Sequence, residues 1–184
     1  ITTDLEGKAR FYNNGVIDMG AYELEYSTAV IYVKEGGTGP GTSWDCASGD
    51  LQGAINSANS GDEVWVARGS YKPATSQGYY IMKEGVKIYG GFEGNEGSLT
   101  QRDLSKISNS STLQGYNYVV GNLNNDLTPA AVLDGFTITG ALQSGVYNSS
   151  VSPTLRNCII TGNWTGNAGG GVHNINASPV LINC

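Results

Sequence analysis

The chain has 184 residues, enough for one sizeable hydrophobic core, and its 27 glycines are about twice the usual share of about 7%. A net charge of -6 with only 10 Lys and Arg residues argues against nucleic acid as a partner, because phosphate binding needs a basic surface. No apolar run approaches the length of a membrane span. Three cysteines are too few for a disulfide framework.

The first predicted element is a short amphipathic helix over residues 50–59. Its apolar residues are spaced at i, i+3, i+4 and i+7, and they are Leu51, Ala54, Ile55 and Ala58. Asp50 can accept hydrogen bonds from the first free N–H groups, and Gly61 can end the helix in a left-handed conformation. We expect this helix to cover one end of a stack of strands, with an ordinary surface helix as the alternative.

The C-terminal third of the chain repeats itself. Two segments recur at an offset of 26 residues: Ser152-Pro-Thr-Leu-Arg-Asn-Cys158 as Ser178-Pro-Val-Leu-Ile-Asn-Cys184, and Gly145-Val-Tyr-Asn148 as Gly171-Val-His-Asn174. The segment from Leu133 to Gly140 aligns with that from Leu155 to Gly162 at an offset of 22. Segments that keep one offset predict a solenoid, because each coil lays its side chains over those of the coil before.

Within each repeat, apolar and polar residues alternate over short runs, which is typical of strands. Equivalent positions should form ladders: Leu133, Leu155 and Leu181; Phe136, Cys158 and Cys184; Ile138 and Ile160. Such short strands bury their apolar face only by pairing in parallel with the next coil, about 4.8 Å away. Asn157 and Asn183 fall at bends, where Asn tolerates left-handed backbone and its amide can bond to its copy one coil away.

Several motifs follow one another in a characteristic order. They are Tyr32-Val-Lys-Glu-Gly-Gly-Thr-Gly39, the helix segment, Val64-Trp-Val-Ala-Arg-Gly-Ser-Tyr71, Val86-Lys-Ile-Tyr-Gly-Gly-Phe92, Leu133-Asp-Gly-Phe-Thr-Ile-Thr-Gly140 and the Ser-Pro-x-Leu-x-Asn-Cys repeats. Over roughly residues 30–184 this order resembles the N-terminal part of bacterial secreted right-handed parallel β-helix proteins of the pectate-lyase-like superfamily. The resemblance implies an all-β, right-handed parallel β-helix solenoid of about four to five coils with a short N-terminal capping helix. It also implies a secreted, extracellular or cell-surface location, but no particular activity.

Residues 1–25 resemble the segment that closes the C-terminal end of related surface β-helix proteins. The likeness lies in Thr3-Asp-Leu-Glu-Gly-Lys-Ala-Arg10 and Val16-Ile-Asp-Met-Gly-Ala-Tyr-Glu23. Because this segment stands ahead of a fresh cap, we expect tandem β-helix units, with Val16, Ile17 and Met19 packed against the cap or a neighbouring unit. The expected regions are the closing segment at 1–25, a junction with the capping helix at 26–62, and coils at 63–184 of a longer polypeptide.

Candidate catalytic residues are sparse. Uronate elimination needs clustered carboxylates for Ca²⁺ and a basic residue, and glycoside hydrolysis needs two carboxylates. Between Asp126 and Cys184 the only carboxylate is Asp134, which lies in an Asp-Gly turn, and the only bases are Arg156 and His173. We therefore expect no catalytic residues in this chain and interpret Asp134 as a turn residue.

The acids of the segment before residue 110 are the one candidate for a metal site. Glu93, Glu96 and Asp103 surround Arg102 and could bind Ca²⁺. We prefer a solvated loop with local ion pairs, so no metal or cofactor is expected.

The cysteines are expected to be structural. Cys158 and Cys184 share one ladder position and should stack as free buried thiols, although a disulfide between adjacent coils is geometrically conceivable. Cys46 is interpreted as a small packed residue, because no second Cys or His is near it in sequence.

The candidate binding residues are aromatic. Tyr147 aligns with His173 in the repeat. Together with Tyr118 and Trp164, these two residues predict an exposed aromatic strip on the face where relatives of this fold bind polysaccharide. Rings can pack on sugar faces, and the alternative is that they only shield the sheet. We interpret the chain as a structural or adhesive module of a long extracellular surface protein or fibre, with neighbouring β-helix units as partners. A carbohydrate-binding module, or a non-catalytic fragment of a polysaccharide lyase or hydrolase, is the alternative.

Overall fold

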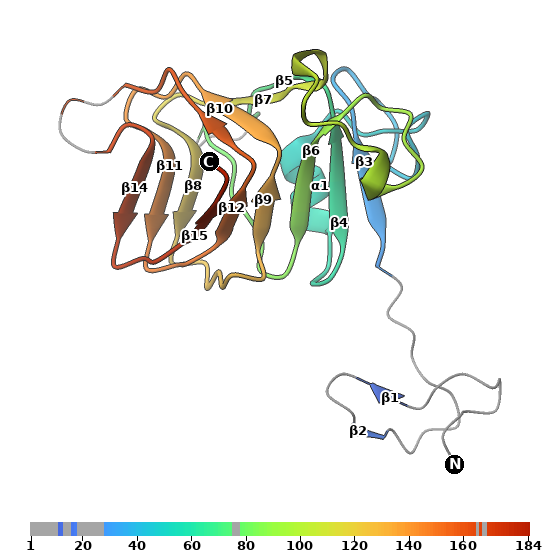
Figure 1. Ribbon diagram of the computed structural model, residues 1–184, viewed down its shortest axis with the longest axis horizontal. Coiled ribbons are helices and arrows are strands. Elements are labelled where there is room, and N and C mark those ends of the chain that lie inside the picture. Colours follow the sequence, from blue (N-terminus) through green and yellow to red (C-terminus); the bar gives the residue numbers. More distant parts are fainter. Residues whose placement is uncertain (1–10, 13–15, 18–27, 75–77, 165, 167–168) are drawn as a thin grey trace.

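The computed structural model describes residues 11–12, 16–17, 28–74, 78–164, 166 and 169–184 (Figure 1). Over residues 28–184 the chain forms a parallel β-solenoid of about four turns, which confirms the predicted fold class. Three sheets line the solenoid, and within each of them every strand pair is parallel. Each complete coil passes through a six-stranded, a four-stranded and a three-stranded sheet in that order, as β9, β10 and β11 do.

The strands are short and follow the chain from one end of the solenoid to the other. The six-stranded sheet contains β3 (Val30–Val33), β4 (Glu63–Ala67), β6 (Lys87–Phe92), β9 (Val132–Asp134), β12 (Thr154–Arg156) and β15 (Val180–Ile182). The four-stranded sheet contains β5 (Gly69–Tyr71), β7 (Ser111–Gln114), β10 (Phe136–Thr139) and β13 (Ile159–Ile160). The three-stranded sheet contains β8 (Tyr118–Leu123), β11 (Ser144–Ser149) and β14 (Val172–Ile175). Two 3-10 helices, η1 (Leu99–Gln101) and η2 (Ile107–Asn109), lie in the insertion between β6 and β7.

The register follows the offsets of the sequence repeat. Leu155 pairs with Leu133 on one side and with Leu181 on the other, and Ile138 pairs with Ile160. Leu133 and Leu155 are buried, whereas Leu181, also expected inside, is 49% exposed. The reason is its position on β15, the edge strand of its sheet among the described residues.

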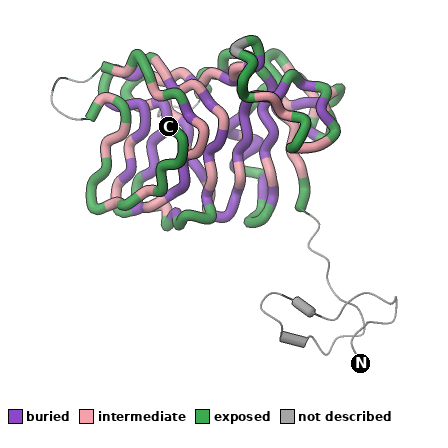
Figure 2. Tube along the Cα trace, viewed as in Figure 1, coloured by how far each residue is buried: buried purple, intermediate pink, exposed green. Residues whose placement is uncertain are grey.

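The core fills the space between the three sheets, where Figure 2 shows the strands of the inner coils as largely buried. Large side chains with less than 2% exposure lie here, and they include Ile88, Leu113, Leu133, Phe136, Ile138 and Leu155. Removing each such side chain from water stabilises the fold by about 1.5–3 kcal/mol. The inward positions of all three sheets contribute, so that each coil is held by its neighbours.

The predicted cap helix is present as α1 (Leu51–Ser57), and it packs against β3 and β4. The Asp50 carboxylate accepts a hydrogen bond from the Gly53 backbone N–H at 2.9 Å. The helix ends earlier than expected, because Ala58 is already extended and the Lys83 ammonium donates to the carbonyls of Asn56 and Ala58. Gly61 is therefore not the helix cap, although it does have a positive φ of 98°.

The bends after β9, β12 and β15 share a left-handed conformation. Asn157 and Asn183 both have φ of 51°, and Gly135, one coil before Asn157, has φ of 82°. The Asn183 side-chain amide donates to the Asn157 side-chain oxygen at 2.8 Å. Residues that tolerate positive φ thus stack along one corner and let every coil turn in the same way.

A second ladder of asparagines lies inside the solenoid, on the three-stranded sheet. The Asn122 amide donates to the Asn148 side-chain oxygen, and the Asn148 amide donates to that of Asn174, each at 3.0 Å. Asn122 and Asn148 have no exposed surface. Each of these two buried amides therefore finds a partner in the next coil, which offsets the cost of removing it from water.

Replacing Asn148 with Ala should destabilise the fold by about 1–3 kcal/mol, because the buried Asn122 amide loses its oxygen acceptor and keeps only the Met82 sulfur at 3.5 Å. Urea unfolding followed by circular dichroism measures the change. The control is Asn117→Ala, at an exposed position, which should change stability by less than about 0.5 kcal/mol. Equal effects of the two substitutions would show that the ladder does not contribute.

The expected closing segment at residues 1–25 lies largely outside the described residues, and Met19 is among those that are not described. Within it, β1 (Phe11–Tyr12) pairs antiparallel with β2 (Val16–Ile17). The predicted packing of this segment against the cap remains a prediction.

Candidate functional site

Aromatic rings form a column on the outside of the three-stranded sheet. The rings of Tyr118 and Tyr147 are stacked, with centroids 4.6 Å apart and an interplanar angle of 16°. Tyr147 and His173, which are partners in the β11 and β14 register, meet edge to face at 5.2 Å. Tyr79 meets Tyr118 edge to face at 5.8 Å and extends the column toward the cap. We call these four residues the aromatic column.

A glycine makes room for the column. Gly121 on β8 pairs in register with Tyr147 on β11, so an aromatic residue is missing from this position of the repeat. A Cβ atom at Gly121 would lie 2.6 Å from the Tyr79 ring, which is closer than any side chain allows. The ring of Tyr79 therefore covers Gly121. Gly121 stands where the next two coils carry Tyr147 and His173. This gap in the repeat was the one sign in the sequence that a ring from another segment, Tyr79, completes the column.

The column shows how three of the predicted binding residues are arranged. Tyr118, Tyr147 and His173 are half-buried, and the stacked pair covers one ring face of each tyrosine. Burial raises the pKa of the Tyr118 hydroxyl, and its two tyrosine neighbours add to this effect. Ring faces that are occupied by other rings are not free to pack on a sugar. This geometry favours shielding of the sheet as the role of the stacked pair.

Trp164, the fourth predicted residue, lies apart from the column. It follows β13 in the turn toward the three-stranded sheet, and its side chain is 69% exposed. Its backbone N–H donates to the Ala141 carbonyl at 2.8 Å, which fixes this turn to the coil before. Among the described aromatic residues, no ring contact joins Trp164 to Tyr147 or His173.

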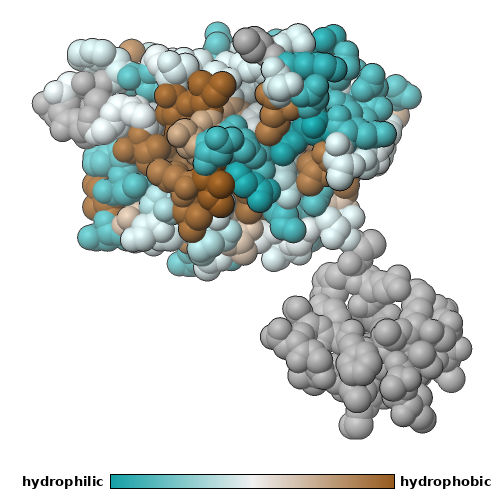
Figure 3. Space-filling model, in the orientation of Figure 1, coloured by the Kyte–Doolittle hydropathy of each residue, from teal (hydrophilic) through white to brown (hydrophobic). Residues whose placement is uncertain are grey.

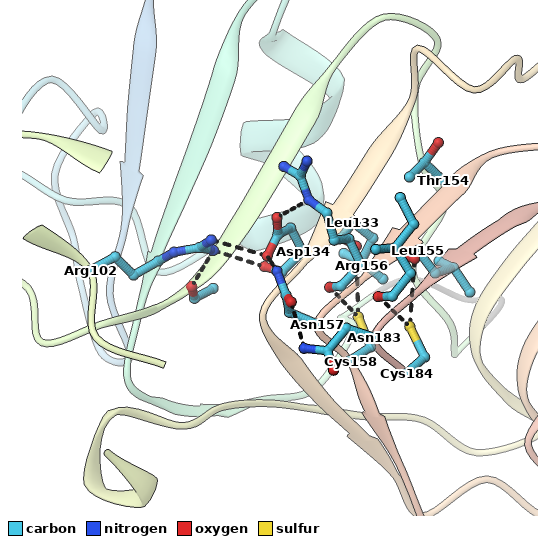
Figure 4. Close-up of polar contacts among 12 residues, drawn as sticks. Arg102, Leu133, Asp134, Thr154, Leu155, Arg156, Asn157, Cys158, Asn183 and Cys184 are labelled. Carbon is cyan, nitrogen blue, oxygen red and sulfur yellow. Dashed lines mark hydrogen bonds and ion pairs between the residues drawn. The ribbon is translucent and has the colours of Figure 1, made fainter. Parts of the chain in front are cut away.

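The six-stranded sheet carries a buried carboxylate, Asp134, that is held by side chains of other segments (Figure 4). Asp134 is 1% exposed, and its two oxygens accept from Arg102, Arg156 and Asn157 at 3.0, 2.5 and 2.9 Å. This hydrogen bond to Asp134 raises the pKa of Arg156 further above its usual range. The Asp134 carboxylate thus accepts hydrogen bonds from three side chains, one in the insertion between β6 and β7 and two in the next coil. His173 lies on a different sheet, so the two groups form no acid and base pair.

Arg102 corrects one expectation. Its guanidinium does not pair with the nearby acids of the insertion but reaches Asp134 across 32 residues. It also donates to the Gly90 carbonyl at 2.9 Å and lies over the rings of Tyr89 and Phe92. Cation and ring attraction adds to the ion pair, so Arg102 holds the insertion between β6 and β7 against the outer face of the sheet.

The acids of that insertion do not converge on a metal site. Burial acts to raise the pKa of Glu96, but hydrogen bonds from the backbone N–H groups of Glu93, Gly94 and Asn95 outweigh it and lower that pKa. Asp103 faces Lys106 at 3.7 Å. Among the described residues, no group of three or more His, Cys, Asp or Glu side chains could hold a metal ion.

The three cysteines are free thiols, and they differ in exposure. Cys158 is buried, whereas Cys184, expected to be buried as well, is exposed on the edge of the last coil. Cys46, interpreted from the sequence as a small packed residue, is also exposed. Burial raises the pKa of Cys158 to about 12.

These differences predict the thiol chemistry. Titration of the native chain with Ellman's reagent at pH 8 should modify Cys46 and Cys184 rapidly, and Cys158 only after denaturation. Because the Cys158 pKa is raised, the thiol ionises more readily in the unfolded chain. The neutral, buried Cys158 thiol therefore favours the folded state fully below the usual pKa of 9.0. This contribution to the free energy of unfolding is lost as the pH rises toward about 12. Rapid reaction of all three thiols in the native chain would contradict the buried ladder position of Cys158.

No protein-family profile, curated protein or solved structure matches the chain. In the part of the chain that the structure describes, no helix is long and apolar enough to cross a membrane.

Proposed function

We propose that this chain is a structural and adhesive module of a long extracellular surface protein, built from β-solenoid units joined end to end. The observation that carries the proposal is the regular stacking of the coils, in which the strands of each sheet follow one another in parallel along one axis. Coils that stack in this way form a rod, whose length grows with the number of coils.

The two ends of the described solenoid differ in the side chains that they expose. Figure 3 shows hydrophobic side chains gathered over β15 and its surroundings. Val180, Leu181 and Ile182 are between 38% and 49% exposed, and Leu181 stands on the ladder that is buried in the two preceding coils. The opposite end differs, because α1 packs against β3 and β4 there.

The secreted, cell-surface location belongs to the proposal and rests on the resemblance to secreted β-helix proteins. A rigid rod of stacked coils suits a protein that projects from a cell, because each coil adds about 4.8 Å of length.

Electron microscopy of the polypeptide that carries this chain tests the proposal. Extended rods with a regular axial repeat, labelled on intact cells by an antibody against residues 28–184, are the expected result. Isolated compact particles, or labelling only after the cells are opened, would contradict it. The test is independent of any ligand and needs only that the chain folds in its natural context.

A further inference from the structure

Exposed apolar side chains gather at the corner between the four-stranded and three-stranded sheets. Tyr116, Leu142 and Trp164 occupy this corner in three successive coils, and they are 66%, 48% and 69% exposed. The backbones are joined from coil to coil, because Leu142 N–H donates to the Tyr116 carbonyl and Trp164 N–H to that of Ala141. We call these three residues the corner ridge. Large exposed apolar residues that are adjacent in space mark interaction sites.

One residue of the ridge, Tyr116, also lines a hollow at this corner. The hollow has a volume of about 490 Å³, and Tyr116, Gln114 and Lys72 supply its principal side chains. Three glycines line it as well, namely Gly78, Gly115 and Gly140. A Cβ atom at Gly140 would find no neighbour closer than the Gly115 carbonyl at 4.0 Å, so this part of the hollow is open. Its volume lies in the range of about 300–1,000 Å³ that is usual for ligand sites.

The polar lining continues along the four-stranded sheet. Gln114 on β7 pairs in register with Thr139 on β10, and Thr112 pairs with Thr137. These side chains are only partly buried. Amide and hydroxyl groups therefore follow the solenoid axis beside the corner ridge. Lys72 is the one charged residue among the described residues that line the hollow.

We propose that the corner ridge and the hollow beside it bind a neutral polysaccharide chain, which runs along the solenoid axis over three coils. A pyranose ring is amphipathic: its C–H face packs on an aromatic ring, and its hydroxyl groups bond to amides and hydroxyls. Tyr116 and Trp164 are two coils apart, so their backbones are separated by about 10 Å along the axis. This spacing suits an extended ligand with a repeating apolar face. The net charge of -6 disfavours a polyanion.

This inference rests on the adhesive part of the proposed function and names its site and ligand. It also differs from the aromatic column. Tyr118 and Tyr147 of the column cover one ring face of each other, whereas Tyr116 and Trp164 are the most exposed of the described large hydrophobic residues. Of the predicted binding residues, only Trp164 belongs to the corner ridge.

Affinity electrophoresis of the 184-residue chain in gels that contain glucomannan, mannan or hydroxyethyl cellulose tests the proposal. At least one neutral polymer should retard the chain, and Tyr116→Ala and Trp164→Ala should each weaken retention about tenfold. Gln114→Ala should weaken it less, because it removes polar contacts alone. Melting temperatures of all variants should stay near that of the parent, since these side chains are exposed or at the surface.

Two matched controls locate the site. Leu123→Ala removes a 42% exposed apolar side chain from the end of β8, away from the corner ridge, and should leave retention unchanged. Tyr147→Phe alters the aromatic column and should also leave it unchanged. The proposal is overturned if no neutral polymer retards the chain, or if retention survives both ridge substitutions. It is equally overturned if polygalacturonate binds more strongly and Lys72→Met abolishes that binding. If electron microscopy shows rods but no neutral polymer retards the chain, the structural role stands and the polysaccharide site is wrong.

Discussion

Replacing Asp134 with Ala is expected to lower the free energy of unfolding by about 3–5 kcal/mol, because it leaves the largely buried Arg102 guanidinium without its partner. Arg102 has a side chain that is only 10% exposed, and it would keep its contacts with the Tyr89 and Phe92 rings but lose its counter-charge. Arg156 loses the same partner one coil further on, and Asn157 loses an acceptor. One substitution therefore weakens the junction of two coils and the attachment of the insertion between β6 and β7.

Urea unfolding of the parent and the variant measures the loss, and hydrogen exchange locates it. The amides of residues 93–110 should exchange faster in Asp134→Ala, because Arg102 no longer holds the insertion. The control is Asp103→Ala, which removes a partly exposed carboxylate whose ion pair with Lys106 measures 3.7 Å. That change should cost much less than Asp134→Ala, because both partners of the Asp103 ion pair keep contact with water. If the two substitutions have similar effects, the buried ion pairs do not organise the insertion.

The coil interior could be predicted from the sequence because it is periodic. The offsets of 26 and 22 residues reappear in the strand register, where Leu155 pairs with Leu181 and with Leu133. The left-handed corner was predictable for the same reason, since Asn157 and Asn183 are copies of each other. A residue that repeats at the spacing of the coil has nearly the same environment in each coil, so one alignment describes all of them.

Contacts that break the period could not be predicted in this way. Arg102 lies in an insertion without a copy, and its partner Asp134 is 32 residues away, so neither spacing nor charge pattern joins them. The aromatic column also departs from the period, because Tyr79 reaches over Gly121 from the segment before β6. The inner ladder of Asn122, Asn148 and Asn174, in contrast, follows the period of the repeat, because its members are 26 residues apart. The spacing of the repeat was therefore enough to predict that these residues stack.

The corner ridge shows why exposed turn residues are harder to predict than the buried residues that stack between coils. Tyr116, Leu142 and Trp164 have different chemistry, and they lie in turns whose lengths differ between coils. An alignment of the strands does not bring such turn residues together. The structure does so through backbone hydrogen bonds, which join Tyr116 to Leu142 and Ala141 to Trp164. Turn residues vary in this way because they lie outside the stacked core, and functional side chains are common in such segments.

Replacing Leu155 with Asp is expected to have the largest effect of all, at least about 4 kcal/mol, because a fully buried site gains an unpaired charge. Leu155 has no exposed surface and is paired on both sides, with Leu133 and Leu181. Losing the side chain alone would cost about 2–5 kcal/mol, and the carboxylate adds the cost of desolvation. Since each coil is stabilised chiefly by its neighbours, the coils from β9 to β15 should unfold together.

Leu181→Asp is the matched control, because Leu181 occupies the same ladder position but is 49% exposed on the edge strand. In the 184-residue chain it should cost about 1 kcal/mol or less, since the carboxylate keeps contact with water. Circular dichroism during urea unfolding gives the free energies, and hydrogen exchange shows which coils are lost. The Leu155→Asp defect should shrink at low pH, because protonation removes the buried charge. If Leu155→Asp unfolds like the parent, or if both variants lose equal stability, the stacking register of the ladder is wrong.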